Sequence, residues 1–236
     1  MKTTDFAECL TAFLKIYLSS RNMSENTVKS YRDTFKLILV FSEEQYHISA
    51  ERLTLEKFNS DFIENFLMWL NTNRDNSVST QNQRLAAIHA FIHYIKTRKP
   101  EYLFQNQRIL EISSLRQPQP ELAYLTAETV KSVIAEISMT TRFGRRDAVL
   151  LSLLYDSAAR VQELTDLRVR DVRLVKPYTV TLTGKGNKAR TVPISTNMAE
   201  ILKSYIKENH LSVNEKLDYP LFFNHQRHKM TRAGIA

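Results

Sequence analysis

Residues 153–194 limit the possible folds of this chain strongly, because patterns for a helix end, a turn, a short helix and a hairpin follow one another there. Residues 148–155 read AVLLSLLY, which predicts a helix that starts near residues 146–147 and is buried nearly all round. Residues 178–183 and 189–194 alternate on either side of a turn that contains glycine, as paired strands do. The stretch therefore predicts a unit with both helices and a small sheet.

Four amphipathic segments precede this stretch. Apolar side chains recur at helical spacing over residues 5–18, 24–41, 60–71 and 80–99, and Ser24 stands where the N-cap of the second segment is expected. Only four glycines occur in 236 residues, which also favours helices. The chain as a whole is expected to be mainly α with a small β-hairpin or sheet.

The domain organisation follows from where the periodicity stops. We expect residues 1–103 to form a helical domain and residues 123–236 to form a second, α+β domain. Residues 104–122 lack periodicity and contain Pro118 and Pro120, which stiffen an extended connection and cannot continue a helix. This segment is therefore predicted to be the linker.

The charge balance suggests a polyanionic partner. The chain has 33 basic and 25 acidic residues, a net charge of +8, and neutralising phosphates releases counterions and strengthens association with nucleic acid. A merely soluble basic protein would have the same composition. Cys9 is the sole cysteine, which excludes a disulfide framework or a cysteine metal cage and fits a reducing cytoplasm. No secretory signal or bilayer-length apolar run is found, so we expect a cytoplasmic protein without a membrane partner.

One helical segment carries a basic stripe. Lys29, Arg32 and Lys36 recur at i, i+3 and i+7, so they share one face of the predicted helix, where a DNA backbone could lie. For any single helix taken alone, a solvated charged face is the alternative interpretation.

Polar residues of the fourth segment are further candidates. Gln81, Arg84, His89 and Lys96 fall outside its apolar stripe and are expected to face solvent or nucleic acid. His89 and His93 have the i, i+4 spacing of a metal pair, but no acidic or cysteine ligand accompanies them. We therefore expect surface or DNA-facing histidines, with no metal and no cofactor.

Two groups in the constraining stretch could bind one phosphate. Arg160 lies at the predicted helix junction, where its guanidinium offers a bidentate fork, and Glu163 is placed to hold that fork. Lys185 lies on the glycine-containing hairpin tip, which allows a ligand to approach closely. The tip is not a P-loop, because the GxxxxGK[ST] spacing is missing. Taken singly, an ordinary Arg–Glu pair and a solvated lysine are the alternatives.

Together, in this order and spacing, these features resemble the tyrosine recombinases (the phage integrase family), most closely the Xer-type and transposon integrases. The resemblance covers essentially the whole chain, and the combination of motifs is specific although each motif alone is less so. The matching residues are 157–164 (SAARVQEL), Leu167, Asp171, 184–188 (GKGNK), Arg190, Val192 and Pro193, and, in the first half, Asn26, Thr27, Ser30, Tyr31, 84–88 (RLAAI), Leu125 and Thr126.

The resemblance implies a fold and a mechanism. It implies an N-terminal four-helix SAM-like core-binding domain and an α+β catalytic domain, which close around double-stranded DNA and work as a tetramer of protomers on paired sites. Arg160 would be the first catalytic arginine and would stabilise the charge of the scissile phosphate. Lys185 would protonate the leaving 5′-oxygen, and Glu163 would be a supporting residue. The family cleaves through a tyrosine that forms a 3′-phosphotyrosyl link.

Basic residues near these motifs complete the expected DNA contacts. Lys188 and Arg190 belong to the hairpin, and Arg227 and Arg232 belong to a basic segment at residues 225–232.

The sequence also departs from the family pattern. The H-x-x-R motif, the second His or Trp and the nucleophilic tyrosine are missing, since Tyr219, the last tyrosine, precedes the segment that they follow. Ala158 stands where the family usually has glycine, which predicts a turn without a positive φ. We therefore expect a C-terminally truncated recombinase that binds DNA but does not cleave it alone. The alternatives are a non-catalytic regulator or competitor at recombination sites, and a helical protein–protein adaptor.

Overall fold

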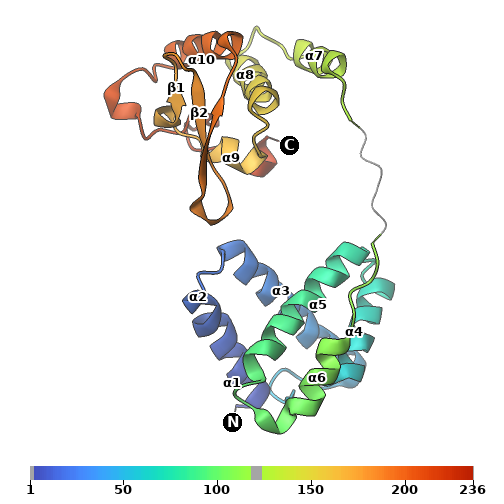
Figure 1. Cartoon of the computed structure of the whole chain (residues 1–236). Coiled ribbons are helices and arrows are strands. Elements are labelled where there is room, and N and C mark those ends of the chain that lie inside the picture. Colours follow the sequence, from blue (N-terminus) through green and yellow to red (C-terminus); the bar gives the residue numbers. More distant parts are fainter. Residues whose placement is uncertain (1–2, 118–123, 236) are drawn as a thin grey trace. The chain divides into compact units, whose positions relative to one another are not determined.

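The computed structural model describes residues 3–117 and 124–235, which divide into two compact units, Met1–Glu121 and Leu122–Ala236 (Figure 1). Pro118 and Pro120, on which the linker prediction partly depends, lie outside the described residues. Among the helices described, none is both long and apolar enough to cross a membrane.

Unit 1 is entirely helical in its described part. The main N-caps are side chains of short polar residues: the Ser24 hydroxyl accepts from the Thr27 N–H, and the Asn59 side chain accepts from the Phe62 N–H. The Ser24 cap is as predicted. The helices are α1 (Asp5–Ala12), continued by a π-helical turn (Phe13–Tyr17) and α2 (Leu18–Ser20), then α3 (Glu25–Tyr46), α4 (Ser60–Thr72), α5 (Val78–Ile95) and α6 (Leu103–Glu111).

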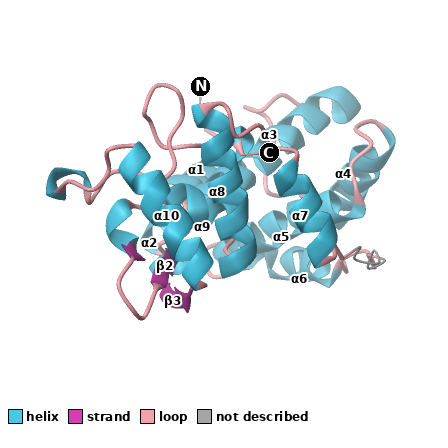
Figure 2. Cartoon of the chain, turned by 90° about the horizontal axis from the view of Figure 1, so that it is seen from above, coloured by secondary structure: helices cyan, strands magenta, loops and turns pink. Residues whose placement is uncertain are grey.

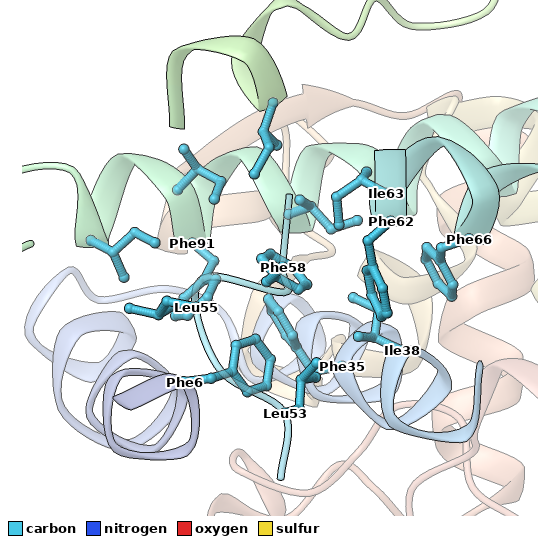
Figure 3. Close-up of a cluster of buried hydrophobic side chains, with 14 of the residues drawn as sticks. Phe6, Phe35, Ile38, Leu53, Leu55, Phe58, Phe62, Ile63, Phe66 and Phe91 are labelled. Atoms are coloured by element: carbon cyan, nitrogen blue, oxygen red, sulfur yellow. The ribbon is translucent and has the colours of Figure 1, made fainter. Parts of the chain in front are cut away.

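Aromatic side chains form the centre of unit 1 (Figure 3). The ring centroids of Phe6 and Phe58 lie 5.1 Å apart, and those of Phe35 and Phe91 also lie 5.1 Å apart. All four rings are at most 1% exposed. These side chains come from α1, α3, α5 and the segment before α4, so one aromatic cluster joins the helices. Burying each such ring contributes about 1.5–3 kcal/mol.

The predicted linker is partly wrong, because its first residues form α6, which is docked on unit 1. Ile109 is fully buried, and Asn106 is 1% exposed. The Gln105 side-chain amide donates to the carbonyls of Leu55 and Phe58, at 2.6 and 3.0 Å. The helix has only nine residues, of which Asn106 and Ile109 are buried, so its apolar stripe is too short to stand out in the sequence.

Unit 2 combines helices with a three-stranded antiparallel sheet of order β1-β2-β3, and Figure 2 shows how much of the chain is helical. β2 and β3 pair with Val180 opposite Val192 and Leu182 opposite Arg190. β1 was not predicted, because two residues are too short to alternate. The elements are α7 (Ala127–Ala135), α8 (Arg142–Ser157), α9 (Val161–Asp166), β1 (Val172–Arg173), β2 (Thr179–Thr183), β3 (Ala189–Pro193) and α10 (Thr196–Glu208).

The core of unit 2 lies between the sheet and its helices. Val180 and Leu182 of β2 are fully buried, whereas Thr179, Thr181 and Thr183 are not. This alternation is what a strand with one interior face requires. The side chains packed against it include Leu153, Leu164, Leu202 and Phe222.

Two details of α8 correct the sequence predictions. The helix begins at Arg142, capped by Thr141, and it is not buried all round, because Tyr155 is 58% exposed. Ala158, at its C-cap, has φ 48° and ψ 35°, so the turn does need a left-handed residue. The chain reverses there from α8 into α9, and an alanine in this conformation costs about 1–2 kcal/mol relative to glycine.

Candidate functional site

Arg160 is held at the junction between α8 and α9. After the left-handed turn at Ala158, its backbone is extended and forms the N-cap position of α9. The Arg160 N–H donates to Oε2 of Glu163 at 2.9 Å, and its Nη1 donates to Oε1 at 3.0 Å. The Arg160 side chain is 76% exposed. The capping geometry therefore fixes the base of the arginine and leaves its guanidinium open to a ligand.

Glu163 is the buried centre of this site. Its side chain is 2% exposed, and it accepts from Arg190 through two parallel bonds of 2.7 Å, Nη1 to Oε1 and Nη2 to Oε2. Arg190 belongs to β3, so this carboxylate joins the α8–α9 junction to the hairpin. The two bonds from Arg190, together with those from Arg160, hold the pKa of Glu163 down to about 2, against the opposing effect of burial.

Gly184 lets the hairpin approach this carboxylate. A Cβ at residue 184 would stand 3.0 Å from Oε1 of Glu163 and 3.9 Å from Nη1 of Arg190. Gly184 has φ −100°, a value that any residue adopts, so backbone conformation does not favour glycine here. The short distance from a Cβ to Glu163 does.

The hairpin tip carries two exposed lysines. The Gly184 N–H donates to the Lys188 carbonyl at 2.9 Å and closes the loop. Inside it, Gly186 (φ 75°) and Asn187 (φ 59°) are left-handed. Lys185 and Lys188 are both exposed. In Figure 1 the tip projects away from α8 and α10. Because both lysines are exposed, a large ligand can reach them.

Arg190 has a partner within unit 2 that the sequence did not suggest. The sequence suggested a DNA contact, but both of its terminal nitrogens are engaged by Glu163. The strand register would have indicated this interior partner. Arg190 is paired with the fully buried Leu182, and directly opposed residues of antiparallel strands share a face, so Arg190 is directed toward the interior side of the sheet.

The basic stripe of α3 is present as predicted. Lys29, Arg32 and Lys36 are all exposed. Lys36 makes a loose pair with Asp33, with 3.9 Å between Nζ and Oδ1. An exposed pair of this kind contributes little and does not prevent Lys36 from meeting a phosphate.

Two polar residues of α5 are used inside unit 1, contrary to the prediction, whereas His93 and, just after the helix, Lys96 are exposed as expected. Gln81 is 5% exposed and donates to the Asn76 carbonyl at 3.0 Å. Arg84 is half-buried, and its Nη1 donates to the Ser30 carbonyl and to the Thr34 hydroxyl, at 3.2 Å each. These residues lie where α5 contacts α3 and the loop before α5. Their amide and guanidinium groups therefore donate hydrogen bonds to backbone carbonyls of those segments.

His89 is also not a surface histidine. A ring nitrogen lies 3.0 Å from the Ile109 carbonyl of α6, and burial lowers the pKa of His89. No group of three or more His, Cys, Asp or Glu residues that could hold a metal ion is found within residues 3–117 and 124–235.

The basic segment after Phe223 forms a tight turn. The Asn224 N–H donates to the His228 carbonyl at 2.8 Å, and Arg227 is left-handed, with φ 62°. Arg227 and Arg232 are both exposed. Thr231 caps a short 3-10 turn over Arg232–Gly234.

Two family models match the chain: the phage integrase family over residues 123–236 and the N-terminal SAM-like domain of phage integrases over residues 10–101. The integrase/recombinase y4rD of Sinorhizobium fredii is 31% identical over 223 residues, which cover 94% of this chain and 79% of that protein. The chain belongs to the phage integrase family. Another relative of this tyrosine recombinase family is XerD of Listeria monocytogenes, 25% identical over 94% of this chain and 73% of that protein.

Solved structures of tyrosine recombinases share the fold. The XerH recombinase bound to difH substrate has a TM-score of 0.64 and 23% identity, covering 96% of this chain and 67% of that one. The Tn1549 transposon integrase with transposon right end DNA has a TM-score of 0.69 and 13% identity, covering 96% and 74%. A λ integrase tetramer bound to a Holliday junction has a TM-score of 0.67 and 14% identity, and the match covers 98% of this chain and 62% of that one. The SAM-like helical domain and the α+β integrase domain are thus the architecture that the motifs implied.

Proposed function

We propose that this 236-residue chain binds double-stranded DNA as a tyrosine recombinase does, with Arg160 and Lys185 set against one phosphate, and does not cleave DNA by itself. The observation that carries the proposal is the position of Glu163. Its carboxylate bonds to the junction that bears Arg160 and to the hairpin that bears Lys185, so one buried group supports both cations.

The chemistry of the two cations suits phosphoryl transfer. Nε and Nη2 of Arg160 make no hydrogen bond within the described residues, and the side chain is 76% exposed. A guanidinium held at its base offers these donors to phosphate oxygens and stabilises charge that grows in the transition state. Lys185, on the projecting tip, is proposed to protonate the leaving 5′-oxygen.

The nucleophile is the missing part of the reaction. The 236 residues contain no H-x-x-R, and Tyr219 donates its hydroxyl to the Arg227 carbonyl, at 2.7 Å. It precedes the segment after which the family's tyrosine comes. We therefore propose that the chain positions a phosphate without attacking it.

DNA contacts outside the site are proposed for the exposed cations of both units. Lys29, Arg32 and Lys36 form the stripe on α3, and Lys188, Arg227 and Arg232 lie on the hairpin and the C-terminal segment of unit 2. Support comes from the XerH and Tn1549 structures, which contain DNA, and from the λ integrase tetramer on a Holliday junction. By this analogy the complete assembly is proposed to be a tetramer on paired sites.

Salt-dependent binding tests the proposal. A fluorescent duplex is titrated at several salt concentrations, and the affinity is expected to fall by about 10³-fold or more between about 50 and 200 mM salt, because a protein of this family contacts several phosphates. A nearly flat salt dependence would favour the protein–protein adaptor instead. In parallel, the chain is incubated with a nicked duplex and analysed on a denaturing gel. A covalent protein–DNA adduct would contradict the absence of cleavage.

A further inference from the structure

We propose that Arg190 is a positioning residue, which sets Lys185 of the hairpin relative to Arg160 by clamping Glu163. The proposal rests on the proposed function, since it concerns how the two phosphate-binding cations are aligned. It goes beyond the resemblance, from which the sequence suggested only a DNA contact for Arg190.

The first argument is the geometry of the contact. Arg190 and Glu163 are joined by two parallel bonds of 2.7 Å each, whereas Arg160 reaches the same carboxylate through one side-chain bond of 3.0 Å and one backbone bond of 2.9 Å. A bidentate pair restricts rotation of both planar groups. Arg190 therefore determines the orientation of the carboxylate that Arg160 then uses.

The second argument is the burial of Glu163. A carboxylate that is 2% exposed needs charged partners, because burying it unpaired is costly. Arg190 is 41% exposed and Arg160 is 76% exposed, so Arg190 is the more enclosed of the two partners. If Arg190 is removed, Arg160 is the cation left to satisfy the carboxylate, and its guanidinium would turn from the ligand toward Glu163.

The third argument is the place of Arg190 in the hairpin. It pairs with Leu182, one step beyond the pair of Thr183 with Ala189 that closes the loop. Gly184, at the start of the loop, lies beside the same carboxylate, since a Cβ built on it would stand 3.0 Å from Oε1. The hairpin thus bonds to Glu163 through Arg190 of β3 and passes close to it again at Gly184, next to Lys185. Fixing Arg190 on Glu163 fixes the base of the projecting tip.

An arginine, and not merely a cation, is required by this arrangement. The fork of a guanidinium matches both carboxylate oxygens at once, and the ammonium of lysine is a point charge without that fork. Arg190→Lys should therefore fail to restore the positioning, although it keeps the charge. Arg168 provides a matched control, because it is an arginine of similar exposure, 48%, paired with the exposed Asp218 and not with Glu163.

The decisive experiment is a double-mutant cycle on DNA binding. Affinity for a fluorescent duplex is measured against salt for the wild-type chain, Lys185→Ala, Arg190→Ala and the double variant. The salt slope is the slope of the logarithm of the affinity against the logarithm of the salt concentration. In the wild-type background, Lys185→Ala is expected to reduce the size of this slope by about 1, as the loss of one phosphate contact does. In the Arg190→Ala background, Lys185 is no longer held at the phosphate, so Lys185→Ala is expected to leave the slope unchanged. In the Arg168→Ala background it should act as in the wild type. Equal effects of Lys185→Ala in all backgrounds would overturn the proposal.

A second measurement does not depend on DNA. Nitroxide labels are attached at Asn187→Cys on the tip and Tyr155→Cys on α8, in a Cys9→Ala background, and their distance distribution is measured by pulsed EPR. Arg190→Ala and Arg190→Lys are expected to broaden the distribution, whereas Arg168→Ala leaves it unchanged. Circular dichroism verifies that each variant is folded, and Arg190→Lys serves if Arg190→Ala does not fold. An unchanged distribution in a folded variant would exclude positioning by Arg190.

The two measurements separate the two proposals. If the wild-type chain binds no DNA, the proposed function is wrong, and the EPR distances alone decide whether Arg190 positions the hairpin. If DNA binds with the expected salt dependence and the cycle shows no coupling, the function stands and the role of Arg190 is wrong.

Discussion

The Glu163 carboxylate accepts from the backbone N–H and from the guanidinium of Arg160, at 2.9 and 3.0 Å, across one turn of α9. The same carboxylate accepts from Arg190 of β3. A residue three positions from the candidate catalytic arginine thus connects a helix start to a strand that is distant in the sequence. The stability of the site should depend on this group more than on any exposed ion pair of unit 2.

Neutralising Glu163 should destabilise unit 2. Glu163→Gln keeps the size of the side chain and loses the charge-assisted bonds from Arg190 and Arg160, so we expect a loss of about 1–3 kcal/mol in the free energy of unfolding, measured in urea. Glu208→Gln is the control: Glu208 pairs with Arg145 at 2.6 Å, but both side chains are 35% exposed. That loss should stay below about 1 kcal/mol. Equal losses in the two variants would contradict the central role of Glu163.

The same carboxylate should make stability depend on acid pH. The two bonds from Arg190, with those from Arg160, hold the pKa of Glu163 at about 2, below the ordinary 4.5. A lowered pKa means that the folded state favours the charged carboxylate, so this stabilisation is complete above about pH 4.5 and is lost as the pH falls toward 2. The difference in unfolding free energy between the wild type and Glu163→Gln should therefore shrink over that interval. A difference that stays constant down to pH 2 would contradict the lowered pKa.

A methyl group at residue 184 should disturb the clamp. Gly184→Ala would bring a Cβ to 3.0 Å from Oε1 of Glu163, and moving the carboxylate would lengthen its bonds from Arg190. We expect the pKa of Glu163, followed by NMR of its carboxyl carbon, to rise toward the ordinary value. Gly234→Ala is the matched control, because its Cβ would meet Thr231 Oγ1 at an ordinary 3.5 Å. An unchanged pKa in Gly184→Ala would show that the hairpin can yield without cost.

Replacing Ala158 by glycine should stabilise unit 2. The residue has φ 48°, a conformation that glycine adopts without the steric cost that alanine incurs, although glycine loses more entropy on folding. The net gain is expected to be about 0.5–1 kcal/mol in thermal or urea unfolding. Ala159→Gly, at a buried neighbour outside the left-handed region, should instead lower the stability. If Ala158→Gly were also destabilising, the left-handed turn would not be the conformation in solution.

Substitutions of the buried Gln81 on α5 and of the basic stripe on α3 should have different effects: the first should lower stability, and the second should weaken DNA binding. Gln81→Ala removes a bond to the Asn76 carbonyl and should cost about 1 kcal/mol of stability with an unchanged salt slope. Lys29→Ala and Arg32→Ala should each reduce the slope by about 1 and leave stability within about 0.5 kcal/mol. If a folded Gln81→Ala variant showed a reduced salt slope, Gln81 would be a DNA contact after all.

Features that depend on neighbouring residues follow from the amino-acid sequence alone. Ser24 caps where predicted, because a cap is a bond between a side chain and an N–H about one turn away. The strands on either side of Gly184 follow from alternation, and the pair of Arg160 with Glu163 follows from their spacing at a helix start. The motifs that place the chain in its family are local in the same sense, so the family could be predicted before any fold was known.

Which polar groups form hydrogen bonds inside the protein depends on the tertiary fold. Arg190 bonds to Glu163 because strand register turns it toward the interior. The packing of unit 1 buries Gln81 and Ile109 of α6, and it brings His89 to 3.0 Å from the Ile109 carbonyl. The left-handed turn at Ala158 is imposed by the reversal between two packed helices, against the preference of its side chain. The physical reason is common to these cases: a charged or polar side chain satisfies whichever partner the fold brings near, and that partner is distant in the sequence.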